Sequence, residues 1–127
     1  MSIDDFSFLI HEIYPESKNA SKVWIKWARE LSNFDSENGR RAHGSYKTAE
    51  MYLEEYANQL RMIYTRYGET VASQIVSLAE VYSCPMPWEM EGAARFLAAG
   101  GDLDEIPEME YAGTLEDYAQ ESAQVFA

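Results

Sequence analysis

Two short patterns in this chain begin like metal-binding motifs, and neither is completed. His11 and Glu12 match the start of the His-Glu-x-x-His helix of zinc proteases, in which two histidines one turn apart hold the metal. The second histidine would fall at Pro15, which has no ligating side chain. Neither His11 nor His43 has a cysteine or histidine neighbour at the spacing of a zinc site. The sequence therefore predicts no zinc centre.

An acidic stretch near the C-terminus opens like a calcium-binding loop. Asp102 and Asp104 occupy the first two ligand positions of an EF-hand. Ile106 then stands at the third ligand position, Pro107 replaces the glycine of the turn, and Gly113 stands where the closing glutamate belongs. We expect no specific metal site and no cofactor, while weak, non-specific binding of divalent cations to so many carboxylates stays open.

No group of residues has the spacing of a catalytic site. Cys84 is the only cysteine, and it has no histidine or base nearby in sequence to activate it as a nucleophile. No glycine pair is followed by the Gly-Lys-Ser/Thr of a phosphate-binding loop. Paired acids such as Glu116 and Asp117 are adjacent, so they point in different directions on a helix. We therefore expect a protein that is not an enzyme.

Length and composition predict one folded domain over residues 1–127. A chain of 127 residues with 46% hydrophobic residues can bury a core and is too apolar for a disordered acidic tail. Asp4 and Asp5 stand where a signal peptide would be positively charged. No apolar run approaches the roughly 18 residues of a membrane span, and a single cysteine fits a reducing compartment. We expect a cytoplasmic protein that binds no membrane.

Hydrophobic spacing predicts an all-α fold, a compact orthogonal bundle of about five to six helices. Ser2 is expected to cap the first helix, and a surface loop is expected at about 33–44 because it is polar and contains two glycines. Inward-facing positions include Tyr64 in the longest helix and Trp88 and Gly92 in the fifth. Five predicted helices cover residues 2–13, 19 or 21 to about 33, 45–67, 70–82 and 88–99. A last predicted helix is capped by Thr114 and runs from Leu115 to at least Phe126.

Most basic residues belong to the first half of the chain, and one group of them lies on one helix. Lys18, Lys22, Lys26 and Arg29 form a row beside the tryptophans of the predicted second helix. We interpret this row mainly as a solvated face. Stacking on nucleic acid is disfavoured, because the formal net charge of −12 repels DNA and RNA. Docking of this row on the acidic half of another copy, which would give a homodimer or a head-to-tail assembly, stays open.

The acidic C-terminal half, residues 68–127, is the feature that points furthest beyond a helical bundle. It holds twelve carboxylates and one base, Arg95, so it carries about −11 of the formal charge of −12. Apolar residues between the acids can hold the backbone in place, and a rigid row of carboxylates can then imitate a row of phosphates. The alternative is that the charge serves solubility alone. The residues predicted to bind a partner are Asp102, Asp104, Glu105, Glu108, Glu110, Glu116 and Asp117.

Part of this acidic half resembles a known protein family. The stretch Gly101 to Glu108, followed by Tyr111 and by Glu116 to Ala119, is similar to a segment of the ArdA antirestriction proteins of mobile elements. Those proteins are acidic DNA mimics that occupy the DNA site of type I restriction enzymes. The resemblance covers about residues 101–121 and implies an acidic decoy from a phage or conjugative element. Small acidic anti-CRISPR proteins are similar in the same general way.

Two functional hypotheses follow from the sequence. In the first, the chain is an acidic interaction module that binds a basic, nucleic-acid-binding defence protein, such as a restriction or CRISPR effector, and competes with nucleic acid. In the second, it is a helical adaptor or assembly protein that self-associates or docks a partner subunit without catalysis. A steep fall of affinity with salt is expected for the first.

Overall fold

The computed structural model describes residues 1–37, 47–81 and 84–108, and within these ranges the chain is all-α. The predicted fold class is confirmed, and no strand occurs in the described ranges. The sequence pattern of residues 23–27 is also compatible with a strand, but these residues lie within a helix. The elements are α1 (Ile3–Ile13), α2 (Ala20–Glu37), α3 (Ala49–Tyr67), α4 (Glu69–Val81), the 3₁₀-helix η2 (Pro87–Glu89), α5 (Met90–Ala98) and the 3₁₀-helix η3 (Leu103–Glu108).

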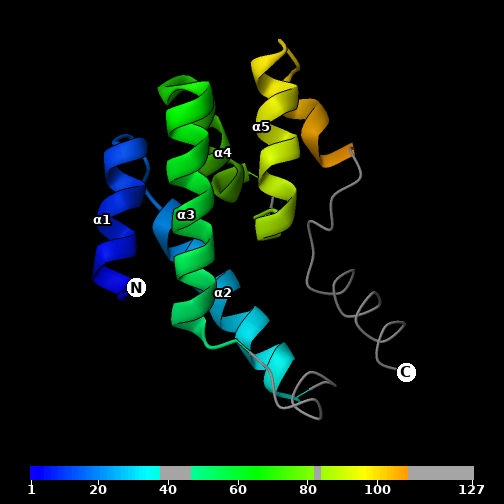
Figure 1. Ribbon diagram of the computed structural model, residues 1–127. Helices are drawn as coiled ribbons and strands as arrows, with labels where there is room; N and C mark the ends of the chain where they lie inside the picture. Colours follow the sequence, from blue (N-terminus) through cyan, green and yellow to red (C-terminus); the bar gives the residue numbers. More distant parts are fainter. Residues whose placement is uncertain (38–46, 82–83, 109–127) are drawn as a thin grey trace.

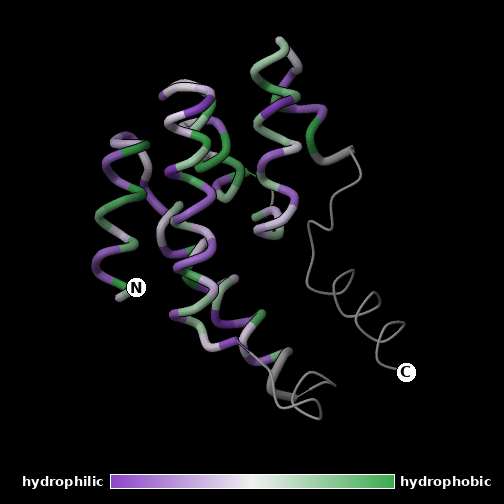
Figure 2. The backbone as a smooth tube through the Cα atoms, in the orientation of Figure 1, coloured by the Kyte–Doolittle hydropathy of each residue, from purple (hydrophilic) through white to green (hydrophobic). Residues whose placement is uncertain are grey.

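The longest helix, α3, is the centre of the bundle. In Figure 1, α1 lies beside it on one side and α5 on the other, while α2 and α4 lie behind it. All four of these helices contact α3. Figure 2 shows hydrophobic and hydrophilic residues alternating along each helix, as expected of helices that bury one side against their neighbours.

Local capping explains where several helices begin and end. The Ser2 hydroxyl accepts a hydrogen bond from the Asp5 N–H at 3.1 Å, as the sequence predicts. Thr48 caps α3 through the Met51 N–H at 3.2 Å, so this helix begins at Ala49 and not at the predicted Ser45. Gly68 ends α3 with a φ of 97°, a left-handed conformation that glycine adopts without steric strain.

The boundary of α2 corrects the predicted surface loop. The helix continues to Glu37, so a loop that starts at residue 33 is wrong for its first residues. Phe34 lies three residues after the buried Leu31, and it packs against the core as a partly buried side chain. The packing of Phe34 continues the apolar side of α2 into the polar stretch that had been predicted as a loop. The rest of the predicted loop, residues 38–44, lies outside the described residues.

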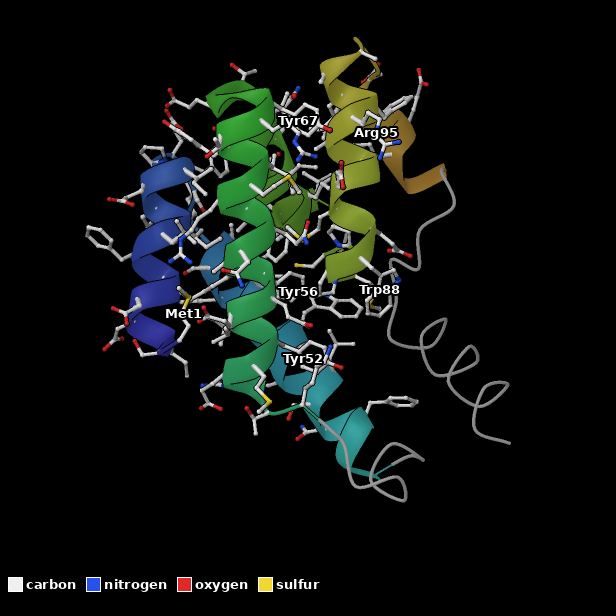
Figure 3. The ribbon with its side chains drawn as sticks, viewed as in Figure 1. Met1, Tyr52, Tyr56, Tyr67, Trp88 and Arg95 are labelled. Atoms are coloured by element: carbon white, nitrogen blue, oxygen red, sulfur yellow. The ribbon has the colours of Figure 1, made fainter. Side chains whose placement is uncertain are left out.

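The centre of the core is a pair of aromatic rings from α2 and α3. Trp24 and Tyr56 are both 0% exposed, and their rings meet edge to face with centroids 4.8 Å apart. The Trp24 indole donates to the Val76 carbonyl at 3.2 Å, and the Tyr56 hydroxyl donates to the Pro85 carbonyl at 3.1 Å. Figure 3 shows Tyr56 pointing from α3 toward α5. The Trp24 ring therefore joins α2 to α4, and the Tyr56 ring joins α3 to the segment that precedes η2.

Three residues predicted to face inward are exposed. Tyr64 is 45% exposed and Trp88 is 53% exposed, and Gly92 also lies at the surface. Trp88 lies in η2, where a tighter 3₁₀ turn changes the helical phase, so that Pro87 and Met90 are buried in its place. Tyr64 is exposed beside a hollow between α1 and α3. Spacing alone identified the helices but not these local departures.

Candidate interaction surfaces

The end of α5 positions the acidic residues that follow it. Gly100 has a φ of 96°, and its N–H donates to the Leu97 carbonyl at 3.0 Å. The N–H of Gly101 donates to the Phe96 carbonyl, also at 3.0 Å. These two bonds form the Schellman arrangement, which satisfies the last carbonyls of a helix and reverses the chain direction. The helix therefore ends one residue before the predicted position 99.

Beyond this turn, η3 and the residue before it display three predicted partner-binding residues on a fixed backbone. Ile106 is 0% exposed and Leu103 is partly buried, so both anchor η3 in the core. The side chains of Asp102, Asp104 and Glu105 are exposed, and we call them the η3 carboxylates. Asp102 also orders the turn, since one carboxylate oxygen accepts from the Asp104 N–H at 3.0 Å and its carbonyl accepts from the Glu105 N–H at 3.0 Å.

The other predicted partner-binding residues are not placed beside them. Glu108 ends η3, but its side chain lies outside the described residues. Glu110, Glu116 and Asp117 lie wholly outside the described residues, so their predicted role stays a prediction. The structure thus brings together three of the seven predicted residues.

Two further acids of the C-terminal half have contacts within the fold. Glu91 pairs with Arg66 at 2.9 Å and lies 3.7 Å from the Arg95 guanidinium. Glu89 accepts a hydrogen bond from the Met86 N–H at 3.2 Å, which holds the start of η2. Figure 3 shows Arg95 on α5, and Glu91 belongs to the same helix. The acidic area available to a partner is therefore narrower than the charge count predicts.

Glu80 has a structural role that the sequence analysis missed. Its Oε1 accepts from the Lys18 N–H at 2.9 Å, from the Asn19 N–H at 3.4 Å and from the Ser17 hydroxyl at 3.2 Å. The Tyr14 hydroxyl donates to its Oε2 at 3.4 Å. The Lys18 hydrogen bond is the main reason that the pKa of Glu80 is lowered. Glu80 therefore fixes the start of α2 from a position 62 residues away along the chain.

Three residues of the predicted basic row lie on α2, and the fourth, Lys18, lies in the turn just before it. Lys18, Lys22, Lys26 and Arg29 are all exposed. Lys26 lies 3.8 Å from Glu30, whereas the other three make no ion pair in the described part of the chain. No carboxylate occurs between residues 17 and 29, although the chain has 22 acids. We call these four residues the cationic row.

Cys84 is buried, and burial raises the pKa of its thiol well above the usual range, which disfavours the reactive thiolate. Within the described ranges, no three histidine, cysteine, aspartate or glutamate side chains gather as metal ligands would. Over the same ranges, every helix is too short or too polar to cross a membrane.

Comparison with other proteins identifies no related protein. The chain matches no protein-family model, no curated protein and no solved structure. The resemblance of residues 101–121 to the ArdA proteins therefore stays a prediction.

Proposed function

We propose that this protein is an acidic interaction module that binds a basic, nucleic-acid-binding protein through the η3 carboxylates and competes there with nucleic acid. The observation that carries the proposal is the fixed display of Asp102, Asp104 and Glu105. Their backbone is held by the turn at Gly100 and by the buried Ile106. Because the backbone is ordered before binding, a partner loses less conformational entropy than it would with a flexible acidic tail.

Charge supports the same partner class. A net charge of −12 attracts a cationic cleft at long range and accelerates encounter, while fixed carboxylates determine where the contact forms. The resemblance to ArdA favours a partner from a defence system, either a restriction enzyme or a CRISPR effector, and a source in a phage or mobile element. No chemistry by this chain is part of the proposal.

The test is competition with a duplex for a type I restriction enzyme. The triple variant Asp102→Asn, Asp104→Asn and Glu105→Gln removes three charges. The new amide oxygen at position 102 can still accept the hydrogen bond from the backbone N–H of residue 104, so the turn is kept. We expect the affinity of this variant for the enzyme to fall at least about tenfold, which corresponds to about 1.4 kcal/mol.

The matched control removes three exposed charges elsewhere, as Asp4→Asn, Glu16→Gln and Glu50→Gln. It has the same net charge as the η3 variant and should compete nearly as well as the wild type. Equal losses in the two variants would mean that net charge alone drives binding, and the proposed surface would then be wrong.

Self-association is the second candidate, and the cationic row favours it. Lys18, Lys22 and Arg29 lack ion pairs in the described structure, so they are available to carboxylates of another copy. Sedimentation velocity of the wild type and of Lys22→Glu tests this reading at several salt concentrations. A salt-sensitive oligomer that the variant loses supports an assembly protein, and a monomer under all conditions contradicts it.

A further inference from the structure

The ring of Phe96, near the end of α5, lies against the backbone of Gly101. A β-carbon placed on Gly101 would overlap three atoms of this ring, closer than real side chains approach one another. Phe96 is partly buried and packs against the core. Its carbonyl also accepts the hydrogen bond from the Gly101 N–H at 3.0 Å. Phe96 therefore contacts Gly101 with both its side chain and its main chain.

The glycine at position 101 has a different cause from the glycine before it. Gly100 has a φ of 96°, so its backbone conformation favours glycine. Gly101 has no positive φ, so backbone strain does not explain why this position lacks a side chain. The Phe96 ring does explain it, because the ring fills the space that a side chain would need. Position 101 is thus matched to the aromatic ring five residues before it.

This contact lies directly before the η3 carboxylates. The chain turns back at the end of α5 and enters η3 (Figure 1). Asp102 follows Gly101, and its oxygens accept the N–H groups of Asp104 and Glu105, both at 3.0 Å. A displacement of Gly101 would therefore move the residue on which the whole turn depends. The buried Ile106 anchors the segment further along, so Phe96 and Ile106 hold it from two sides of the turn in sequence.

We propose that Phe96 is the positioning residue of the η3 carboxylates. Its ring and carbonyl hold Gly101, so that the three carboxylates project in one fixed arrangement before a partner arrives. The inference rests on the proposed function for what these carboxylates bind, whereas the positioning is a property of the free protein. Phe96 carries no charge, and it acts through Gly101 without contact to the partner.

Hydrogen–deuterium exchange of the free protein tests the positioning. The reporters are the N–H groups of Asp104 and Glu105, because Asp102 accepts both within the turn. Phe34→Ala is the matched control for general destabilisation, since it removes another partly buried ring that packs against the core. Phe96→Ala should speed exchange at the reporters about tenfold more than this control does. Phe96→Tyr keeps the ring and should exchange as the wild type does.

A double variant tests whether the ring acts through Gly101. Gly101→Ala alone places a methyl group where the ring lies, so it should also speed exchange at the reporters. When Phe96→Ala has removed the ring, the methyl group has room, and Gly101→Ala should add less than about a twofold further change. Effects of the two changes that simply multiply would show that the ring does not act through this glycine, and the inference would be wrong.

Binding to a type I restriction enzyme tests what the positioning serves. Phe96→Ala keeps the net charge of −12, so the long-range attraction is unchanged. We expect its affinity to fall about tenfold and to depend less steeply on salt, because carboxylates that are no longer held together make fewer contacts at once. Reduced stability alone would leave the salt dependence as it is. Phe96→Tyr should bind as the wild type does.

The outcomes separate this inference from the proposed function. Exchange at the reporters that is no faster in Phe96→Ala than in Phe34→Ala would overturn the inference, whatever the protein binds. Faster exchange with unchanged affinity for the enzyme would also overturn it, since the positioning would then serve no binding. Faster exchange in Phe96→Ala, together with no binding by the wild type, would support the positioning and contradict the proposed function.

Discussion

The Oε1 oxygen of Glu80, one residue before the end of α4, accepts a hydrogen bond from the backbone N–H of Lys18 at 2.9 Å. Since that N–H lies just before α2, the carboxylate fixes the turn that leads into the helix, while the Ser17 hydroxyl accepts from the first helical N–H, that of Ala20, at 3.0 Å. Glu80 also accepts from Asn19, Ser17 and Tyr14. This acid therefore belongs to the fold.

Removal of this carboxylate should destabilise the protein. We expect Glu80→Ala to lower the free energy of unfolding by about 1 kcal/mol, the usual net contribution of a hydrogen bond to stability. Glu80→Gln should cost less, because the amide oxygen can keep the three hydrogen bonds that Oε1 accepts. Urea denaturation followed by tryptophan fluorescence measures both. An alanine variant as stable as the wild type would show that water replaces the carboxylate without loss.

The same carboxylate should contribute a pH dependence on the acid side. The pKa of Glu80 is lowered in the folded protein, chiefly by the Lys18 hydrogen bond, so its ionised form is favoured by folding. Its contribution is complete above the unfolded pKa of about 4.3 and is lost as the pH falls through the lower folded value. The stability difference between wild type and Glu80→Gln should therefore shrink below about pH 4. A stability difference between the two proteins that grows as the pH falls would contradict the prediction.

The buried hydroxyl of Tyr56 should matter more than its exposed counterpart on the same helix. Tyr56→Phe leaves the buried Pro85 carbonyl without its donor, which should cost about 1–3 kcal/mol. Tyr64→Phe removes a hydroxyl from a 45% exposed ring and should stay within about 0.5 kcal/mol of the wild type. Chemical denaturation of the pair checks this, and similar losses in the two variants would count against the assigned hydrogen bond.

Replacing two glycines of the α5 region with alanine should change the stability of the protein in opposite directions. Gly100 has a φ of 96°, so Gly100→Ala should destabilise the protein by about 1–2 kcal/mol and disturb the turn that leads to η3. Gly92 is exposed within α5 and has open space around it, so Gly92→Ala should stabilise the helix by about 0.5–1 kcal/mol. Thermal unfolding distinguishes them, and a neutral Gly100→Ala would show that the chain reverses without the left-handed conformation.

Sequence reasoning identified the features that depend on neighbouring residues. Ser2 caps α1 as predicted because capping chemistry is local, and hydrophobic spacing located the helices. Features that depend on distant contacts were missed or wrong. The pairing of Glu80 with Lys18 joins two segments that no local pattern relates, and Trp88 is exposed because Pro87 starts a 3₁₀ turn before α5.

The candidate site shows the same division. The apolar Leu103 and Ile106 correctly indicated that the acidic stretch is anchored, so the exposure of Asp102, Asp104 and Glu105 follows from their position around these anchors. Charge counting could not separate these acids from Glu91, which Arg66 and Arg95 engage from two helices.

Hydrogen–deuterium exchange of the protein in complex with a type I restriction enzyme tests the central claim most directly. The account predicts slower exchange at Gly101 through Glu105 in the complex, and recovery of the free rates when excess duplex DNA displaces the protein. Unchanged exchange at these residues in a formed complex, or protection there that DNA does not reverse, would contradict the claim that the η3 carboxylates occupy a nucleic-acid site.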